Sequence, residues 1–322
     1  MKLHLINTEF ASDNIGDQVI MGGIKKNFLE EIISNHEYSE HANHDGLGSE
    51  TKKIIKDKNP ILLLGSNAIP ARRIPFVTRN IVNIPTNHIG YFNKNIVSIG
   101  CGLERYPDKN NPFLYSFIDK IFNKKAPHSV RDEATRLYLL ENGFKNVFNT
   151  SCPSIWGVDP EKEYRPSFDS CVISINGYKK SSSDIKALRE ITTLFNNVYF
   201  FPQHKADLDY FKELAAADTS LESILIISRN LQQLLKLMRE KSPIHIGNRL
   251  HCGLFFIAND LYSFSVNIDN RAMEISKDLN IPSINRDNLF TDSLHDKLTN
   301  FKVNLPKETI QTFKEEFNSY FF

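Results

Sequence analysis

The sequence predicts an α/β fold in which two Rossmann-like domains face a cleft. Short apolar runs alternate with helical patterns along almost the whole chain, and a polar, proline-containing segment divides them into two sets. Strand–helix alternation of this kind is typical of parallel sheets built from βαβ units. The length of 322 residues is sufficient for two domains, each with its own core.

Ten short runs are predicted to be strands, and many are continuously apolar, as expected for strands covered on both faces. The first set is Leu3–Ile6, Ile61–Leu64, Ile96–Ile99, His128–Val130 and Val147–Asn149. The second set is Cys171–Ile175, Val198–Phe201, Ile224–Ile227, Ile244–Ile246 and Tyr262–Val266.

Helix signals lie between these runs. Leu231, Leu234, Leu235 and Met238 follow the i, i+3, i+4, i+7 spacing of an amphipathic helix. Asp132 is suited to cap the start of another helix, and Gly143 to follow its end.

The boundary between the domains is expected within residues 156–168, which are polar and contain two prolines. Residues 1–160 and 161–305 then form two Rossmann-like domains, the arrangement called GT-B. Pro306 and the helical spacing of Ile310, Phe313, Phe317 and Phe321 predict a terminal helix over 306–322, with the N-terminal domain as one docking site.

Composition excludes several classes of protein. The net charge is +1, without the basic excess of a nucleic-acid-binding protein. No segment approaches the roughly 20 apolar residues of a membrane span. The four cysteines form no CxxC pair, so neither a disulfide framework nor a metal site is expected. We expect a cytoplasmic protein without a cofactor, and peripheral contact with the inner face of the membrane stays open.

The segment Ile244–Gly253 carries the strongest functional signal. A buried strand ends at Gly247, and Arg249 and His251 follow where a helix should begin. In open α/β sheets, ligands bind beyond the carboxyl ends of strands, near helix N-termini that favour anions. The Arg249 guanidinium suits a carboxylate or phosphate, and the His251 imidazole suits proton transfer. The structural alternative is a surface arginine and a capping histidine.

Arg131 occupies an equivalent position in the first set, directly after the strand at 128–130. If the two domains face each other, Arg131 and Arg249 converge on one trianionic ligand. The alternative is an ion pair between Arg131 and a nearby acid.

Near the start, Asp13, Asn14, Gly16 and Asp17 lie between the first strand and the helix expected at 20–29. Gly16 permits a tight turn. Asp17 is either an N-cap or a base that faces a substrate hydroxyl.

Two further residues follow strands of the second set. His204 is either a functional residue or a helix cap, and Tyr178 lies in a loop where its ring could stack on a sugar.

In this order, four motifs give the chain a resemblance to the polysaccharide pyruvyl transferases. They are N-x-G-D at 14–17, R-D-x-x-T at 131–135, C-P at 152–153 and G-x-R-L-H at 247–251. The resemblance extends across most of the chain, and the R-L-H segment is its most specific part.

The resemblance implies transfer of a pyruvyl group from phosphoenolpyruvate to a sugar, with a cyclic ketal as product. It implies that Arg131, Arg249, Leu250 and His251 bind the donor and that His251 is the acid. The acceptor side would include Asn14, Gly16 and Asp17, with Asp17 and then Asp13 as candidate bases. The acceptor could be a lipid-linked oligosaccharide, a nucleotide sugar or a polymer.

Two other functions stay open at this point. A GT-B glycosyltransferase that uses a nucleotide sugar would also place arginines and acids at strand ends. A non-catalytic member could bind a sugar within a polysaccharide assembly complex. An unrelated oxidoreductase is discounted because no G-x-G-x-x-G follows a predicted strand.

Overall fold

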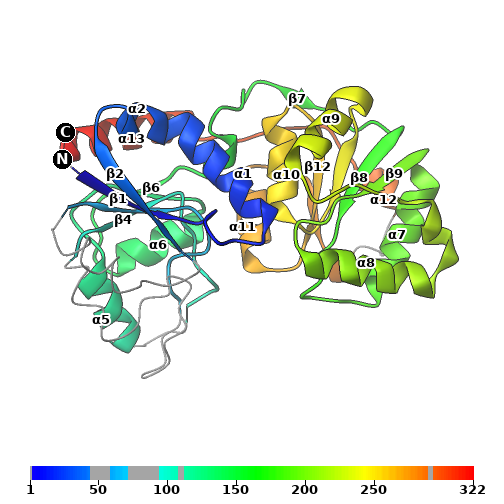
Figure 1. The fold of residues 1–322 in the computed structure, drawn as a ribbon, viewed down its shortest axis with the longest axis horizontal. Coiled ribbons are helices and arrows are strands. Elements are labelled where there is room, and N and C mark those ends of the chain that lie inside the picture. The colour runs from blue at the N-terminus through cyan, green and yellow to red at the C-terminus, as the bar shows by residue number, and fades with distance from the viewer. Residues whose placement is uncertain (1, 44–58, 72–93, 108–111, 289–292) are drawn as a thin grey trace. The chain divides into compact units, whose positions relative to one another are not determined.

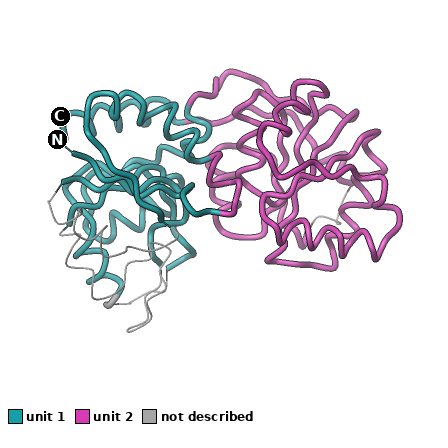
Figure 2. Tube along the Cα trace, in the orientation of Figure 1, with its two compact units in different colours: residues 1–12, 20–156, 306–322 teal, residues 13–19, 157–305 magenta. Residues whose placement is uncertain are grey.

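The computed structural model describes residues 2–43, 59–71, 94–107, 112–288 and 293–322. These residues form two compact units (Figure 2). Unit 1 contains Met1–Ser12, Ile20–Trp156 and Pro306–Phe322, and unit 2 contains Asp13–Val19 and Gly157–Leu305. The change from unit 1 to unit 2 after Trp156 lies at the start of the segment expected to separate the domains.

Unit 1 is built on a parallel sheet (Figure 1). Its strand order is β2-β1-β3-β4, with β1 at Lys2–Asn7, β2 at Glu37–Ala42, β3 at Ile61–Leu64 and β4 at Ile96–Ile99. A parallel pair, β5 (His128–Val130) and β6 (Val147–Asn149), is linked to the end of β4 by a bridge between Cys101 and Val130. The strands β3 and β4 are entirely buried, which explains their continuous apolar runs.

The helices of unit 1 follow the strands as βαβ connections require. In the described residues they are α1 (Ile15–Ile24, which begins in the Asp13–Val19 segment of unit 2), the π-helical turn η1 (Lys25–Leu29), α2 (Glu30–Ile33), α5 (Pro112–Ile121), α6 (Glu133–Glu141), the 3-10 turn η3 (Pro153–Ile155) and α13 (Lys307–Phe321). Asp132 caps α6 by accepting a hydrogen bond from the Thr135 N–H at 2.7 Å. Gly143 follows the C-cap with φ of +82°, so both predicted helix signals are confirmed.

The terminal helix α13 packs within unit 1. Phe313 and Phe317 are fully buried, and their rings lie 5.6 Å and 5.0 Å from the ring of Phe28. The ring of Trp156 lies 6.3 Å from the rings of both Phe28 and Phe313. The period of aromatic residues in this segment therefore reflects one buried helix face.

Unit 2 contains a sheet of six parallel strands in the order β10-β9-β8-β11-β12-β13. Their bounds are β8 Ser170–Ser174, β9 Asn197–Phe200, β10 Leu225–Ile226, β11 Ile244–Gly247, β12 Ser263–Asn267 and β13 Ser283–Asn285. A short antiparallel pair joins β7 (Glu163–Tyr164) to β14 (Phe301–Lys302). The order is that of a doubly wound Rossmann sheet, with its switch point between β8 and β11.

Helices cover both faces of this sheet. They are α7 (Ser183–Leu194), α8 (Lys205–Ala217), α9 (Leu231–Lys241), α10 (Leu250–Ala258), α11 (Asn270–Asp278) and α12 (Leu294–Lys297), with 3-10 turns η4 (Thr219–Ser223) and η5 (Arg286–Asn288). Val172 packs with Leu234, Met238 and Phe256 from α9 and α10. The next residue, Ile173, lines a cavity of about 30 Å³ under α7. The predicted α/β class with Rossmann-like parallel sheets is confirmed.

All ten predicted strands are present, and four strands of the described residues were missed: the two-residue strands β7 and β14, and the edge strands β2 and β13. β2 (EYSEHA) is mostly polar and partly exposed, and β13 is three residues long and partly exposed. Neither produces the apolar run of a strand covered on both faces.

The N-terminal motif also lies elsewhere than expected. Residues 13–19, expected in the first domain, group with unit 2. The Ile15 N–H donates to the Gln203 carbonyl at 3.0 Å, and the Ile15 side chain packs into the unit 2 core.

Candidate active site

The residues with the strongest sequence signals lie at the switch point of the unit 2 sheet. Tyr178 lies in the loop after β8, and Arg249 and His251 follow β11, the neighbouring strand. The carboxyl ends of two adjacent parallel strands whose connections run in opposite directions leave a crevice between the following loops. Local sequence order thus places these side chains at the edge where α/β proteins bind ligands.

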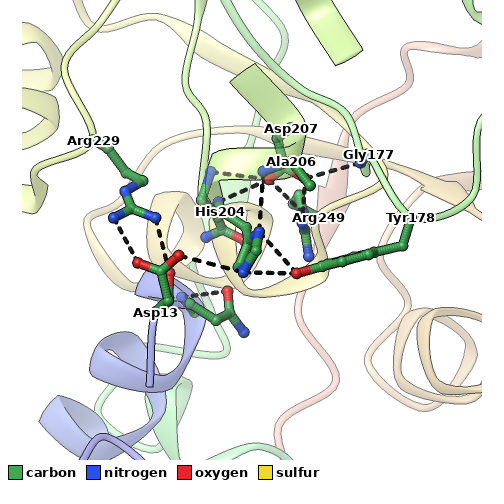
Figure 3. Close-up of polar contacts among 11 residues, drawn as sticks. Asp13, Gly177, Tyr178, His204, Ala206, Asp207, Arg229 and Arg249 are labelled. Carbon is green, nitrogen blue, oxygen red and sulfur yellow. Dashed lines mark hydrogen bonds and ion pairs between the residues drawn. The ribbon is translucent and has the colours of Figure 1, made fainter. Parts of the chain in front are cut away.

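Arg249 is held in a fixed orientation by Asp207 (Figure 3). Its Nε donates to Asp207 Oδ2 at 2.8 Å, and its Nη2 donates to Oδ1. The Asp207 carboxylate is fully buried, and the Arg249 side chain is only 11% exposed. A two-point contact of this kind fixes the plane of the guanidinium as well as its position.

The Asp207 carboxylate is anchored in turn by the main chain. It accepts hydrogen bonds from the N–H groups of Gly177, Gln203 and His204 at 2.9, 3.1 and 3.0 Å. A Cβ on Gly177 would lie 2.0 Å from the Ala206 carbonyl oxygen, so only glycine allows this approach of the β8 loop to α8. The carboxylate that orients Arg249 is therefore itself held in place by backbone N–H groups.

Tyr178 covers the Arg249 guanidinium from another side. The carbon at the centre of that group lies 5.7 Å from the ring centroid, within the range of a cation–π contact. The Tyr178 side chain is 63% exposed. Partial desolvation of the hydroxyl raises the pKa of Tyr178, and the charge of Arg249 opposes this rise. An exposed ring beside a fixed cation is suited to contact an uncharged part of a ligand.

His204 is the N-cap of α8, which confirms the structural alternative for this residue. Its Nδ1 accepts from the Ala206 N–H at 3.1 Å, so in the neutral ring the proton is on Nε2. Nε2 lies 2.7 Å from the Tyr178 hydroxyl and 3.4 Å from Asp13 Oδ2. The ring therefore positions Tyr178, and its acceptor-binding role stays a prediction.

Asp13 is paired with a residue that the sequence analysis did not identify. Arg229 Nη2 lies 2.6 Å from Asp13 Oδ1, and Nη1 donates to the Asp13 carbonyl at 3.1 Å. The hydrogen bond from Arg229 holds the pKa of Asp13 below its usual range. A carboxylate with a lowered pKa is a weaker base, which reduces the case for Asp13 as the catalytic base.

His251 lies in the first turn of α10 and is 6% exposed. Its Nδ1 would lie 3.2 Å from a Cβ built on Gly16, so the imidazole packs against the backbone of the N-terminal motif. Leu250, the first residue of α10, is 5% exposed, and Arg249 is the N-cap without a side-chain capping bond. The amide groups at this helix start favour an anion next to Arg249.

The interpretation of Asp17 as an N-cap is wrong. The helix α1 begins at Ile15, and Asn14 Oδ1 accepts from the Gly16 N–H at 3.1 Å. Asp17 lies in the first turn and is 6% exposed. Asn14 therefore has the capping role, and Asp17 is left as a candidate base.

Arg131 belongs to unit 1, where it is 1% exposed. Its guanidinium donates to Asn67 Oδ1, lies 3.6 Å from Asp132 Oδ2 and covers Gly102, where a Cβ would lie 2.2 Å from Nε. These contacts fit the predicted ion-pair alternative. Donor binding by Arg131 stays a prediction.

The described residues contain no group of three or more His, Cys, Asp or Glu side chains placed to hold a metal ion. All four cysteines are buried and form no disulfide with one another, and burial raises the pKa of Cys252, beside the site, to about 12. No described helix is both long and apolar enough to span a membrane.

Sequence reasoning gave Asp207 no role and missed Arg229. Asp207 had one usable signal, because an acid three residues after an N-cap is typical of a capping box. Arg229 follows β10 in a loop without a recognisable pattern, and its partner lies 216 residues away in the sequence.

The comparisons with solved structures define the fold class. The Methanocaldococcus jannaschii UDP-GlcNAc 2-epimerase, solved with UDP-GlcNAc and UDP, is similar with a TM-score of 0.57 and 14% identity, over 99% of this chain and 100% of the other. S. aureus MnaA, solved with UDP, is similar with a TM-score of 0.51 and 11% identity, over 98% and 90%. The predicted GT-B-like fold is confirmed by these matches, which at such identities concern the fold alone.

The family is shown by sequence. The family model for polysaccharide pyruvyl transferase matches residues 14–270, which include Gly16, Asp17, Arg131, Arg249 and His251. The chain therefore belongs to the polysaccharide pyruvyl transferase family, as the four motifs predicted. None of the curated proteins matches it in sequence.

Proposed function

We propose that this pyruvyl transferase uses phosphoenolpyruvate as donor and forms a ketal on two sugar hydroxyls during synthesis of a capsule, exopolysaccharide or cell-wall glycan. One observation carries the proposal. A guanidinium fixed by a buried carboxylate lies at the start of α10, with His251 in the first turn of the same helix. An anion site beside a histidine is what binding and protonation of phosphoenolpyruvate require.

Arg249 keeps a donor for the ligand. Asp207 accepts from Nε and Nη2, whereas Nη1 makes no hydrogen bond with any residue in the described ranges. An oxygen of the donor carboxylate or phosphate can accept from Nη1 and from the amide groups of the first turn of α10. Because Asp207 offsets the charge of Arg249, geometry contributes more to this contact than net charge.

In the proposed reaction, His251 donates a proton to the methylene carbon of phosphoenolpyruvate, which becomes a methyl group. The oxygen of one sugar hydroxyl then bonds to the adjacent carbon, and Asp17 accepts the proton of that hydroxyl. The second hydroxyl displaces phosphate, which leaves with the remaining proton. Asp17 is preferred to Asp13 as base because the pairing with Arg229 lowers the pKa of Asp13.

Calorimetric titration with phosphoenolpyruvate, UDP and inorganic phosphate tests the donor. Arg249→Lys is the informative variant, because it keeps a cation beside the buried Asp207 but removes the planar fork. We expect binding of phosphoenolpyruvate to wild type and a loss of about tenfold or more in Arg249→Lys. His251→Asn should bind the donor within about threefold of wild type and lose about 100-fold or more in turnover.

The outcomes separate the open functions. Binding of UDP in place of phosphoenolpyruvate would favour a nucleotide-sugar glycosyltransferase. Binding of neither ligand would favour a non-catalytic sugar-binding role. Normal turnover of His251→Asn would remove His251 from the mechanism.

A further inference from the structure

A second group of cations lies at the carboxyl edge of the unit 2 sheet. Lys179 follows β8, Arg271 follows β12 and Arg286 follows β13. We call these three residues the basic cluster. Nothing in the proposed binding of the donor uses them.

Contacts between the loops link Lys179 to the segments that carry the other two cations. Lys179 Nζ donates to the Ile268 carbonyl at 3.2 Å, which ties the β8 loop to the β12 loop. Arg286 Nη1 donates to the Lys179 carbonyl, which ties the β13 segment to the same loop. Arg271 lies in the first turn of α11, three residues after Ile268.

The cluster has a cationic excess. Asp184 lies 3.7 Å from Arg286 Nη1, and Asp269 lies 3.0 Å from Arg271 Nη2. The cluster thus has two carboxylates for three cations, and Glu274 and Lys277, which lie further along α11, carry one charge of each sign. The start of α11 adds the partial positive charge of a helix N-terminus.

Two guanidinium groups of the cluster also have a hydrogen-bond donor without an acceptor in the described part of the chain. The Nε atoms of Arg271 and Arg286 are buried and have no hydrogen-bond acceptor among the described residues. A buried donor of this kind costs free energy unless a ligand, ion or water accepts its hydrogen bond. Anionic oxygens are the natural acceptors for donors on a cation.

The loop after β8 links the cluster to the donor site along the chain. Tyr178, whose exposed ring covers Arg249, directly precedes Lys179. An open hollow of about 720 Å³ lies between α11, which carries Arg271, and β13, which precedes Arg286; its lining includes Asn267, Glu274 and Asn285. The loop after β8 thus carries both the ring that contacts Arg249 and one cation of the cluster, and the open hollow lies on the elements that follow β12.

We infer that the acceptor is a sugar diphosphate: the basic cluster binds its diphosphate, and Tyr178 contacts its sugar beside the donor. A finished neutral polymer would leave the excess positive charge without a counter-charge. It would also leave the two buried N–H groups without a hydrogen-bond acceptor. A nucleoside diphosphate and a lipid diphosphate share this chemistry. The inference rests on the proposed function for the position of the donor, but the binding of a diphosphate is tested separately.

Calorimetric titration with inorganic pyrophosphate and with phosphoenolpyruvate, each on the full chain, tests the inference. The variants are Lys179→Gln, Arg271→Gln and Arg249→Lys, with Arg165→Gln as control because Arg165 is 73% exposed and lies outside the cluster. We expect Lys179→Gln and Arg271→Gln to weaken pyrophosphate about tenfold and to leave phosphoenolpyruvate unchanged. Arg249→Lys should have the opposite pattern, and Arg165→Gln should change neither.

Unchanged affinity for pyrophosphate in both cluster variants, at unchanged thermal stability, would overturn the inference. So would loss of pyrophosphate binding in Arg249→Lys alone, because the ion would then occupy the donor site. Failure of phosphoenolpyruvate to bind would contradict the proposed donor without affecting the pyrophosphate result. UDP and farnesyl diphosphate identify the source of the diphosphate. Tighter binding of UDP than of pyrophosphate, with the same sensitivity to Lys179→Gln, shows a nucleotide-linked acceptor. The same result with farnesyl diphosphate shows a lipid-linked acceptor.

Discussion

The helix α1 contains three glycines with different surroundings, which allows a sharp test of the contact with His251. A Cβ on Gly16 would lie 3.2 Å from His251 Nδ1, and a Cβ on Gly22 would meet nothing within 4 Å. On Gly23 it would lie 2.4 Å from the Ser154 Cα and 2.5 Å from the Pro153 carbonyl oxygen. Alanine at the three positions therefore separates helix propensity, crowding of a side chain and a backbone clash.

The magnitudes follow from these distances. Gly22→Ala should stabilise the protein by about 0.5–1 kcal/mol, because alanine loses less conformational entropy than glycine in a helix. Gly16→Ala should be close to neutral, since a similar gain is offset by crowding. Gly23→Ala should cost roughly 1–3 kcal/mol or more, because main-chain atoms of η3 must move.

Activity should follow a different order from stability. In Gly16→Ala the His251 ring and the Asn14 side chain, whose Oδ1 would also lie 3.2 Å from the new Cβ, must shift by a few tenths of an ångström. We therefore expect turnover to fall by roughly tenfold, given that a 1 Å displacement can cost about 100-fold. Gly22→Ala should keep wild-type turnover. The assay is release of inorganic phosphate from phosphoenolpyruvate with an acceptor, together with urea midpoints for each variant.

Equal turnover of Gly16→Ala and Gly22→Ala would refute the argument. It would mean either that the ring moves without consequence or that His251 takes no part in the reaction. A Gly23→Ala variant as stable as wild type would contradict the packing of α1 on η3.

Three other outcomes follow from buried charges. Burial lowers the pKa of His128 to about 4 and that of His245 to about 3, whereas a histidine in the unfolded chain has a pKa of about 6.5. The contribution of the two neutral rings to stability is therefore complete above about pH 6.5. It is lost as the pH falls toward the folded-state pKa values. The unfolding free energy should fall by about 1.4 kcal/mol per histidine for each pH unit between about pH 6 and pH 5, and an unchanged urea midpoint over this interval would contradict it. Asp207→Ala should cost about 3–5 kcal/mol because it strands the Arg249 charge, whereas Asp209→Ala, an exposed position on the same helix, should stay within about 0.5 kcal/mol by urea denaturation. Arg131→Met should lower thermal stability by at least about 1–3 kcal/mol through the loss of the bonds to Asn67 and Asp132, and an unchanged melting temperature would show that the side chain serves binding alone.

The sequence by itself determined ten of the strands, several helix ends and the place of the candidate site. Continuous apolar runs predict strands covered on both faces, and Asp132 and Gly143 report local backbone needs, because each acts within a few residues of its own position. Arg249 and His251 could be assigned to a candidate ligand site because open parallel sheets bind ligands beyond the carboxyl ends of their strands.

Only the tertiary structure decided which side chains meet. Asp207 and Arg249 are 42 residues apart, and Asp13 and Arg229 are 216 residues apart. Such pairs depend on strand order and loop direction, which leave no periodic pattern in the chain. The same holds for Asp13–Val19, which follow a strand of unit 1 but pack with unit 2. Local patterns encode the period and the caps of each element, whereas the partners of a charged side chain are set by the path of the chain between them.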